Sequence, residues 1–190
     1  MKRSEINAAY NKAKFYFEAN GWAILPHFRW DVTDFGLDKF TDYGLVLINL
    51  CEEPEYCEKL MYASHNQKTP AHFHKKKKED IICRSGVLAI KLWNAHENEP
   101  GSGSFSIKIN NTLKSVQSQD TILLKAGERI TIQQGIWHEF WPESPECIIG
   151  EVSTANDDLN DNFFHNPDIG RYPQIDENEV PVIKLISDKP

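Results

Sequence analysis

The stretch from Thr69 to Gly86 reads TPAHFHKKKKEDIICRSG and combines two histidines, four lysines and a glutamate. Residues two apart on a β-strand face the same side, so His72 and His74 can point into one cavity. Glu79 lies at an odd offset from His72, so one straight strand cannot present all three side chains. A turn at residues 75–78 would let Glu79 begin the next strand beside the histidines, with the lysine ammonium groups in water. The stretch therefore predicts either half of a divalent-metal site or a charged surface turn that contains histidine.

Strand-like runs rich in β-branched and aromatic residues follow one another after Trp22, at about one run per ten residues. They are residues 43–50, 55–64, 79–93, 103–110, 118–133, 138–141 and 147–153, with a final short run at 180–186. The first part of the chain differs, because it reads as one helix over residues 4–20. Together these runs predict an all-β sandwich or barrel that carries an N-terminal helix.

The expected helix has a start signal, a stop signal and an apolar stripe. Ser4 is the expected N-cap, and Asn20-Gly21 is a typical end. The apolar residues recur at helical spacing, so this face should pack on the sheet. They are Ile6, Ala9, Tyr10, Ala13 and Phe17.

The length and charge of the chain bound its organisation and its partners. The 190 residues fit a single domain, with a helical arm (1–30), a barrel (40–155) and a C-terminal arm (156–190). A net charge of −7 argues against a nucleic-acid partner. We expect no membrane partner, because no apolar run is long enough to span a bilayer.

The cysteines and the N-terminal sequence indicate a compartment. The four cysteines have no spacing typical of a zinc site. The N-terminus has no apolar segment of the secretory type. These features predict reduced thiols and a cytoplasmic location.

A second candidate segment, GERITIQQGIWHEFWP, covers residues 127–142 and contains His138. With the opening stretch, it forms the patterns H-x-H-x4-E-x6-G and G-x7-G-x2-H. These patterns resemble the two signature motifs of the cupin superfamily, although Gln133 stands where cupins usually have proline. The matching residues are His72, His74, Glu79 and Gly86 in the first motif, and Gly127, Gly135 and His138 in the second. The resemblance implies a cupin fold, a double-stranded β-helix or jelly-roll barrel, here with an N-terminal helix and a C-terminal arm.

The expected ligand set has three imidazoles, one carboxylate and no thiolate. Such a set suits Mn²⁺, Fe²⁺, Co²⁺, Ni²⁺ or Zn²⁺. Four protein ligands leave positions open for a substrate, which is the layout of a catalytic site.

Three further side chains lie in segments that suggest a reaction. GEVSTAND places Glu151 between apolar neighbours, as a candidate general base or as an edge glutamate facing water. QKTPAHFH places Lys68 just before the histidines, and its parity with His72 predicts the same face, although most lysines lie at the surface. IGRYPQIDE places Arg171 in a polar arm that could cross the barrel mouth, although an exposed arginine is the ordinary case.

Together these segments resemble the D-lyxose isomerase family, a group of cupin-type sugar isomerases. The matching pieces are QKTPAHFH, EDIICRSG, GIWHEFW, GEVSTANDD and IGRYPQIDEN, spread over most of residues 66–178. The resemblance implies a D-lyxose ketol-isomerase that interconverts D-lyxose and D-xylulose, and often D-mannose and D-fructose, by proton transfer through a cis-enediol. It also implies a divalent metal, typically Mn²⁺, and a homodimer.

The roles known for the family carry over to matching positions. The implied metal ligands are His72, His74, Glu79 and His138. The implied acid–base residues are Glu151 and Lys68, and Arg171 joins them as a substrate-binding residue. Two other classes stay open on the residues alone: a cupin oxygenase with iron on the same ligands, and a non-catalytic sugar-binding cupin. Oxygen consumption separates the first of these from an isomerase.

Overall fold

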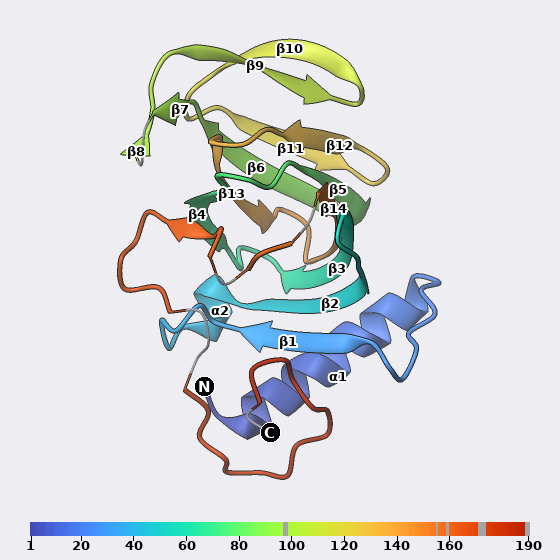
Figure 1. Cartoon of the computed structure of the whole chain (residues 1–190). Coiled ribbons are helices and arrows are strands. Elements are labelled where there is room, and N and C mark those ends of the chain that lie inside the picture. The colour runs from blue at the N-terminus through green and yellow to red at the C-terminus, as the bar shows by residue number, and fades with distance from the viewer. Residues whose placement is uncertain (97–98, 155, 159, 171–173, 189–190) are drawn as a thin grey trace.

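The computed structural model describes residues 1–96, 99–154, 156–158, 160–170 and 174–188. Most of the described chain is built from β-strands, as Figure 1 shows. The elements are α1 (Arg3–Ala19), β1 (Arg29–Thr33), α2 (Phe40–Tyr43), β2 (Leu45–Glu52), β3 (Tyr56–Ser64), β4 (Thr69–Phe73), β5 (Glu79–Ser85), β6 (Val87–Trp93), β7 (Ala95–His96), β8 (Glu99–Pro100), β9 (Ser104–Ile109), β10 (Thr112–Gln117), β11 (Thr121–Lys125), β12 (Arg129–Ile132), β13 (Trp137–Pro142), β14 (Glu146–Thr154) and β15 (Phe163–Phe164).

Two antiparallel sheets form the barrel. One has the order β1-β2-β3-β14-β5-β12-β9-β10 and the other has the order β11-β6-β13-β4-β15. Apolar side chains from both sheets, among them Ile81, Ile90, Ile130 and Phe140, pack in one buried cluster between them. The architecture confirms the predicted all-β cupin barrel with an N-terminal helix and a C-terminal arm.

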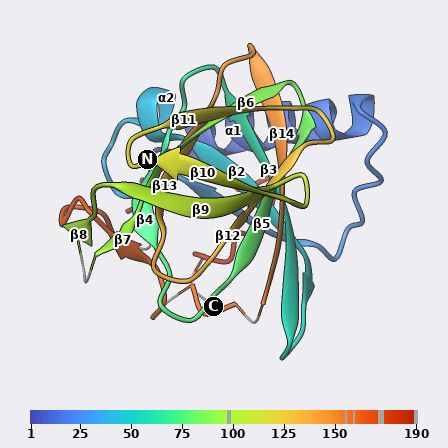
Figure 2. The same cartoon turned by 90° about the horizontal axis from the view of Figure 1, so that it is seen from above.

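Helix α1 lies along the β1 side of the molecule, and the β9–β10 hairpin lies at the opposite end (Figures 1 and 2). The predicted stripe is the packed face, because Ile6, Ala13 and Phe17 are fully buried in a second cluster with Trp30 and Tyr62. No helix within the described ranges is long and apolar enough to cross a membrane.

The start of α1 differs from the sequence prediction. Lys2, and not Ser4, is the N-cap residue, and its backbone N–H donates to Glu5 Oε2 at 2.8 Å. Ser4 binds Asn178 instead, through both its N–H and its hydroxyl. The C-terminal arm therefore takes the polar groups that a Ser4 cap would have used.

The strand expected at residues 180–186 is absent, and only an isolated bridge joins Leu185 to Trp30. Asn7 of α1 takes the backbone groups of this segment: its amide donates to Val180 O at 2.9 Å, and its Oδ1 accepts from Val182 N at 3.1 Å. Pro181 has no N–H to give to a ladder. The arm is thus held by a helix side chain, and not by a sheet.

Strand β10 was not predicted, and it pairs with β9 in a tight hairpin. Asn110 and Asn111 form the turn with φ values of 49° and 62°. Asn-Asn tolerates these left-handed conformations, so the dipeptide was the turn signal in the sequence.

Gly86 separates β5 from β6 inside a run expected as one strand. Its φ is 86°, and a Cβ there would collide with Ser144 Oγ and Glu146 O. The first glycine of the cupin motif is therefore required by a turn that packs against the chain entering β14.

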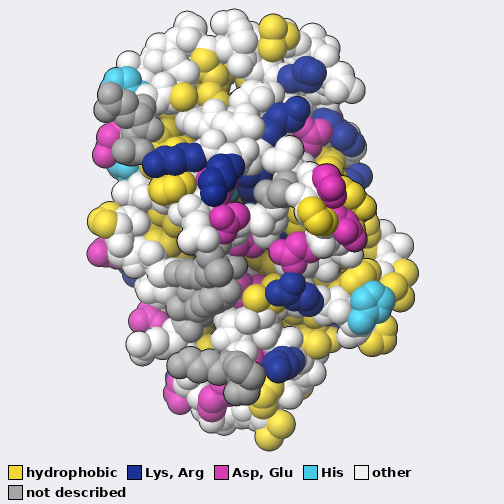
Figure 3. All heavy atoms as spheres, in the orientation of Figure 1, with side chains coloured by type: hydrophobic (Ala, Val, Ile, Leu, Met, Phe, Trp, Pro, Cys, Tyr) yellow, Lys and Arg dark blue, Asp and Glu magenta, His cyan; other side chains and the backbone are white. Residues whose placement is uncertain are grey.

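Charged side chains of both signs are interspersed on the face shown in Figure 3. Among the described residues visible there, most lysines and arginines lie over the upper half of the face, with aspartates and glutamates beside them.

Two phenylalanines of α1 test the packing of the helix. Phe17 is 0% exposed and Phe15 is 73% exposed. We expect Phe17→Ala to lower the free energy of unfolding by about 3–5 kcal/mol, because it leaves a cavity against Trp30 and Tyr62. Phe15→Ala should change it by less than about 0.5 kcal/mol. Urea denaturation measures both, and equal effects would contradict this packing.

Candidate metal centre

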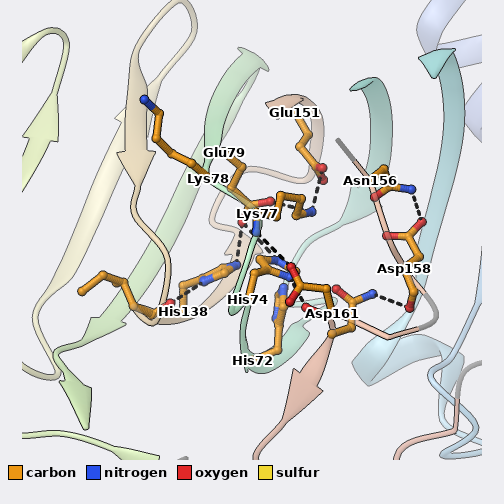
Figure 4. Close-up of polar contacts among 12 residues, drawn as sticks. His72, His74, Lys77, Lys78, Glu79, His138, Glu151, Asn156, Asp158 and Asp161 are labelled. Carbon is orange, nitrogen blue, oxygen red and sulfur yellow. Dashed lines mark hydrogen bonds and ion pairs between the residues drawn. The ribbon is translucent and has the colours of Figure 1, made fainter. Parts of the chain in front are cut away.

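The predicted ligand residues come together inside the barrel, and Figure 4 shows their side chains converging. His72 is in β4 directly opposite His138 in β13, His74 follows β4, and Glu79 begins β5. All four are buried, and one ligand atom from each lies within 4.8 Å of the others. The turn at residues 75–78 returns the chain so that Glu79 faces the histidines, as the sequence predicted.

The three imidazoles share one pattern of hydrogen bonding. Each ring contacts a backbone carbonyl oxygen through Nδ1, so Nδ1 carries the proton and Nε2 keeps a lone pair. The partners are Pro70 O for His72 (2.7 Å), Asp161 O for His74 (2.7 Å) and Ile136 O for His138 (3.1 Å).

The buried polar atoms of the cluster show whether a metal would fit there. Within the described residues, His74 Nε2, His138 Nε2 and Glu79 Oε1 are buried without a hydrogen-bond partner. Glu79 Oε1 lies 2.9 Å from His138 Nε2 and 3.5 Å from His74 Nε2, so acceptors face one another. A divalent cation would satisfy all of them, because neutral imidazoles and a carboxylate are its usual ligands.

The protonation of the ligands also suits a cation. Burial, followed by the neighbouring His138 and His74, holds the pKa of His72 well below its usual range. Burial alone would raise the pKa of Glu79, but the Lys77 ammonium opposes burial, and that pKa lies well below normal. A neutral imidazole and an ionised carboxylate are the forms that bind metal.

Lys77 corrects the prediction that the lysine run lies in water. Lys75, Lys76 and Lys78 are exposed, but Lys77 is only 5% exposed. Its Nζ lies 2.8 Å from Glu79 Oε2 and 2.9 Å from Glu151 Oε1. Burial would lower the pKa of Lys77, but the two carboxylates outweigh burial and raise it. The sequence could not indicate which lysine turns inward, because the four residues of the run are identical.

Glu151 lies inside the barrel and not at a water-facing edge. It is 6% exposed in β14, and its Oε1 lies 3.6 Å from Lys59 Nζ in addition to its contact with Lys77. Two ammonium groups thus balance the charge of this buried carboxylate. The arrangement can accept a proton at Glu151 and donate hydrogen bonds from Lys77.

Lys59 was not singled out in the sequence. It is opposite Glu151 in the pairing of β3 with β14, and its Nζ donates to Asn156 Oδ1 at 2.9 Å and Asp158 Oδ1 at 3.0 Å. Burial opposes its charge, but Glu151 and Asp158 outweigh burial and raise the pKa of Lys59. Only the strand register identifies this residue, because nothing in its local sequence marks it.

Lys68 is not brought to the cluster. Its Nζ lies 3.5 Å from Glu139 Oε1 and 4.8 Å from the centre of the Trp141 ring, and its side chain is 37% exposed. The expectation that it shares a face with the histidines was therefore wrong. Arg171, the other residue of the predicted substrate contacts, lies outside the described residues.

A β-bulge explains the position of Lys68. His72 is opposite His138, and Thr69 is opposite Phe140. An advance of three residues along β4 therefore matches an advance of two along β13. The extra residue reverses the alternation of faces. Thr69, and not Lys68, therefore lines the cavity with His72.

The cluster opens into a cavity of about 290 Å³. Its polar lining includes Lys59, Lys77 and Glu151, and aromatic side chains form part of its wall: Phe35, Phe140 and Phe164. This volume is near the lower end of the ligand pockets of proteins, at about 300 Å³. The cavity suits a small polar molecule with an apolar face.

Comparisons with known proteins identify the family of this chain. A model of the D-lyxose isomerase family matches residues 27–189. The chain is 37% identical over 171 residues to a D-lyxose/D-mannose isomerase of Escherichia coli O157:H7, covering 84% of this chain and 75% of the relative. It is 37% identical over 164 residues to a D-lyxose/D-mannose isomerase of Serratia proteamaculans, covering 80% and 72%.

A solved structure shares the fold. The L-ribose isomerase of Cellulomonas parahominis with L-ribose matches with a TM-score of 0.72 at 18% identity, covering 93% of this chain and 98% of that chain. The family match on residues 27–189 includes the strands that carry the cluster. This chain belongs to the D-lyxose isomerase family.

Proposed function

We propose that this protein is a metal-dependent aldose–ketose isomerase that interconverts D-lyxose and D-xylulose, with D-mannose and D-fructose as a second pair. The observation that carries the proposal is the buried Glu151 carboxylate, bridged by Lys77 to the His–Glu cluster in one cavity. The names of the relatives support the choice of sugars.

The reaction moves one proton between C1 and C2 of the sugar and one hydroxyl proton between O1 and O2, so that the carbonyl changes carbon through a cis-enediol. Glu151 is the proposed base: it takes the proton from one carbon and returns it to the other. A divalent metal held by His72, His74, Glu79 and His138 would supply a Lewis acid for the carbonyl and for the negative charge of the enediolate.

Lys77 is the proposed partner of Glu151, in place of Lys68. Its ammonium lies between Glu79 and Glu151, so it can donate a hydrogen bond or a proton to a sugar oxygen bound there. Lys68 has its polar contact with Glu139 and stacks on Trp141, which does not support a role at the carbonyl. Arg171 stays a proposed sugar contact on the family resemblance alone.

The remaining parts of the proposal rest on the resemblance and on ligand chemistry. Manganese is the proposed metal, and the nitrogen and oxygen ligands suit Mn²⁺ as they suit Co²⁺, Fe²⁺, Ni²⁺ or Zn²⁺. A homodimer in the cytoplasm belongs to the same proposal. Size-exclusion chromatography with light scattering tests the dimer.

The rival cupin oxygenase makes a different prediction about oxygen. We expect the Mn²⁺-loaded protein to convert D-lyxose and D-mannose under anaerobic conditions, because proton transfer consumes no oxidant. Chelated protein should be inactive and should regain activity and metal together when Mn²⁺ is returned.

Turnover that needs oxygen would overturn the isomerase proposal. Sugar binding without turnover would favour the non-catalytic alternative. D-xylose serves as a comparison sugar, and metal analysis is run on the same sample.

Glu151→Gln tests the base. We expect exchange of the substrate C2 proton with solvent to fall by about 10²–10⁴-fold, because an amide cannot accept that proton. Bound metal should be unchanged. Glu146→Gln is the matched control on the same strand, where the carboxylate accepts a hydrogen bond from Tyr62 instead of facing the cavity. Normal turnover by Glu151→Gln would remove Glu151 from the mechanism.

Neighbouring lysines test the assignment of the ammonium. Lys77→Met should lower kcat by about 10²-fold or more, the usual scale for a lost acid–base group. Lys78→Met, in the same turn but exposed, should resemble the unsubstituted enzyme. Lys68→Met decides between the two candidates: a large loss there, with Lys77→Met active, would restore the role first expected of Lys68.

A further inference from the structure

Asp161 makes an unusual set of contacts with the lysine turn. The residue is 2% exposed, and its carboxylate accepts hydrogen bonds from three consecutive backbone N–H groups. Oδ1 accepts from Lys75 N (2.9 Å) and Lys76 N (3.1 Å), and Oδ2 accepts from Lys76 N (3.1 Å) and Lys77 N (2.9 Å). One side chain thus holds the backbone from which Lys77 enters the cavity, as Figure 4 shows.

The backbone N–H groups of the turn explain why a carboxylate binds there. Consecutive N–H groups form a concavity that favours an anion, and bonds to a carboxylate are stronger than neutral ones. The ammonium groups of residues 75–78 would otherwise separate from one another into water. From the turn bound by Asp161, Lys77 is directed inward while Lys75, Lys76 and Lys78 stay exposed.

The same residue also contacts a predicted metal ligand. Asp161 O accepts from His74 Nδ1 at 2.7 Å, which leaves Nε2 of that ring free to bind metal. Asp161 follows β14, more than 80 residues after the lysine turn. A single residue beyond the barrel strands therefore orients both His74 and Lys77.

We infer that Asp161 is a positioning residue of the isomerase: its carboxylate fixes the 75–77 backbone and thereby places the Lys77 ammonium between Glu79 and Glu151. The carboxylate does not act on the sugar, because its hydrogen bonds go to the turn. The inference rests on the proposed function only for its catalytic consequence. The hold on the turn can be measured without any reaction.

Asp161→Asn is the direct test. An amide keeps one acceptor oxygen but turns a donor toward the N–H groups of Lys76 or Lys77, so the turn loosens. We expect kcat to fall by about 10–100-fold, the scale of a misplaced catalytic group, with KM and bound metal little changed. Asp157→Asn is the matched control: it removes the charge that faces Lys76 Nζ at 3.7 Å in the same segment, keeps an oxygen that can accept from Asn160 N, and should leave kcat unchanged.

A double-mutant cycle separates positioning from general structure. In a Lys77→Met background there is no ammonium to place, so Asp161→Asn should lower kcat by less than about threefold, a coupling of neighbouring residues. The full 10-fold or greater loss in both backgrounds would overturn the inference. An equal loss in Asp157→Asn would do the same.

Amide hydrogen exchange tests the hold itself on the unsubstituted protein, so it does not depend on whether Asp161→Asn folds. We expect slow exchange of the amides of Lys76 and Lys77, loss of this protection in Asp161→Asn, and its retention in Asp157→Asn. Exchange at the rate of a free turn in the unsubstituted protein would overturn the inference. If Lys77→Met is fully active while these amides are protected, the proposed role of Lys77 fails and Asp161 is left as a purely structural anchor.

Discussion

The buried contacts of Lys77 with Glu79 and Glu151 are the constraint on which the rest of the site depends. Closing the barrel removes two carboxylates from water at the same place as three imidazoles. Breaking a buried ion pair by removing one partner typically costs about 3–5 kcal/mol, because the remaining charge is uncompensated. The Lys77 ammonium forms ion pairs with both carboxylates. The remaining lone pairs, on Glu79 and the histidines, converge where a cation would bind. The charge balance of the cavity therefore favours the burial of one lysine from this turn.

The strands supply this arrangement from distant parts of the chain. The pairing of β4 with β13 places His72 against His138, and the pairing of β3 with β14 places Lys59 against Glu151. The segment after β14 then closes the site, because Asp161 holds the lysine turn. The His–Glu cluster, the proposed base and its cation are thus assembled mainly by ladders of backbone hydrogen bonds, with Asp161 as an anchor from outside the ladders. Such a scaffold holds side chains more rigidly than a loop would.

The bulge in β4 changes which side chains of the strand face the cavity. Alternation along a strand is a reliable rule only while the ladder is regular. Between Thr69 and His72 the ladder gains a residue, so Lys68 lies beside Glu139 although its spacing from the histidines suggested the cavity. The replacement, Lys77, stands in the turn that spacing alone assigned to solvent.

Local spacing and motifs were enough to predict the all-β barrel, the stripe of α1 and the four residues of the His–Glu cluster, because each depends on near neighbours or on a motif. They could not determine which lysine enters the cavity, that Lys59 faces Glu151, or that Asp161 holds the turn. These depend on strand register, on a bulge and on the charge balance of a closed cavity, which arise only when segments far apart in the chain pack together. The prediction of a strand at residues 180–186 was wrong for the same reason. Strand propensity is a local property, but the partner of these backbone groups is Asn7 of the helix.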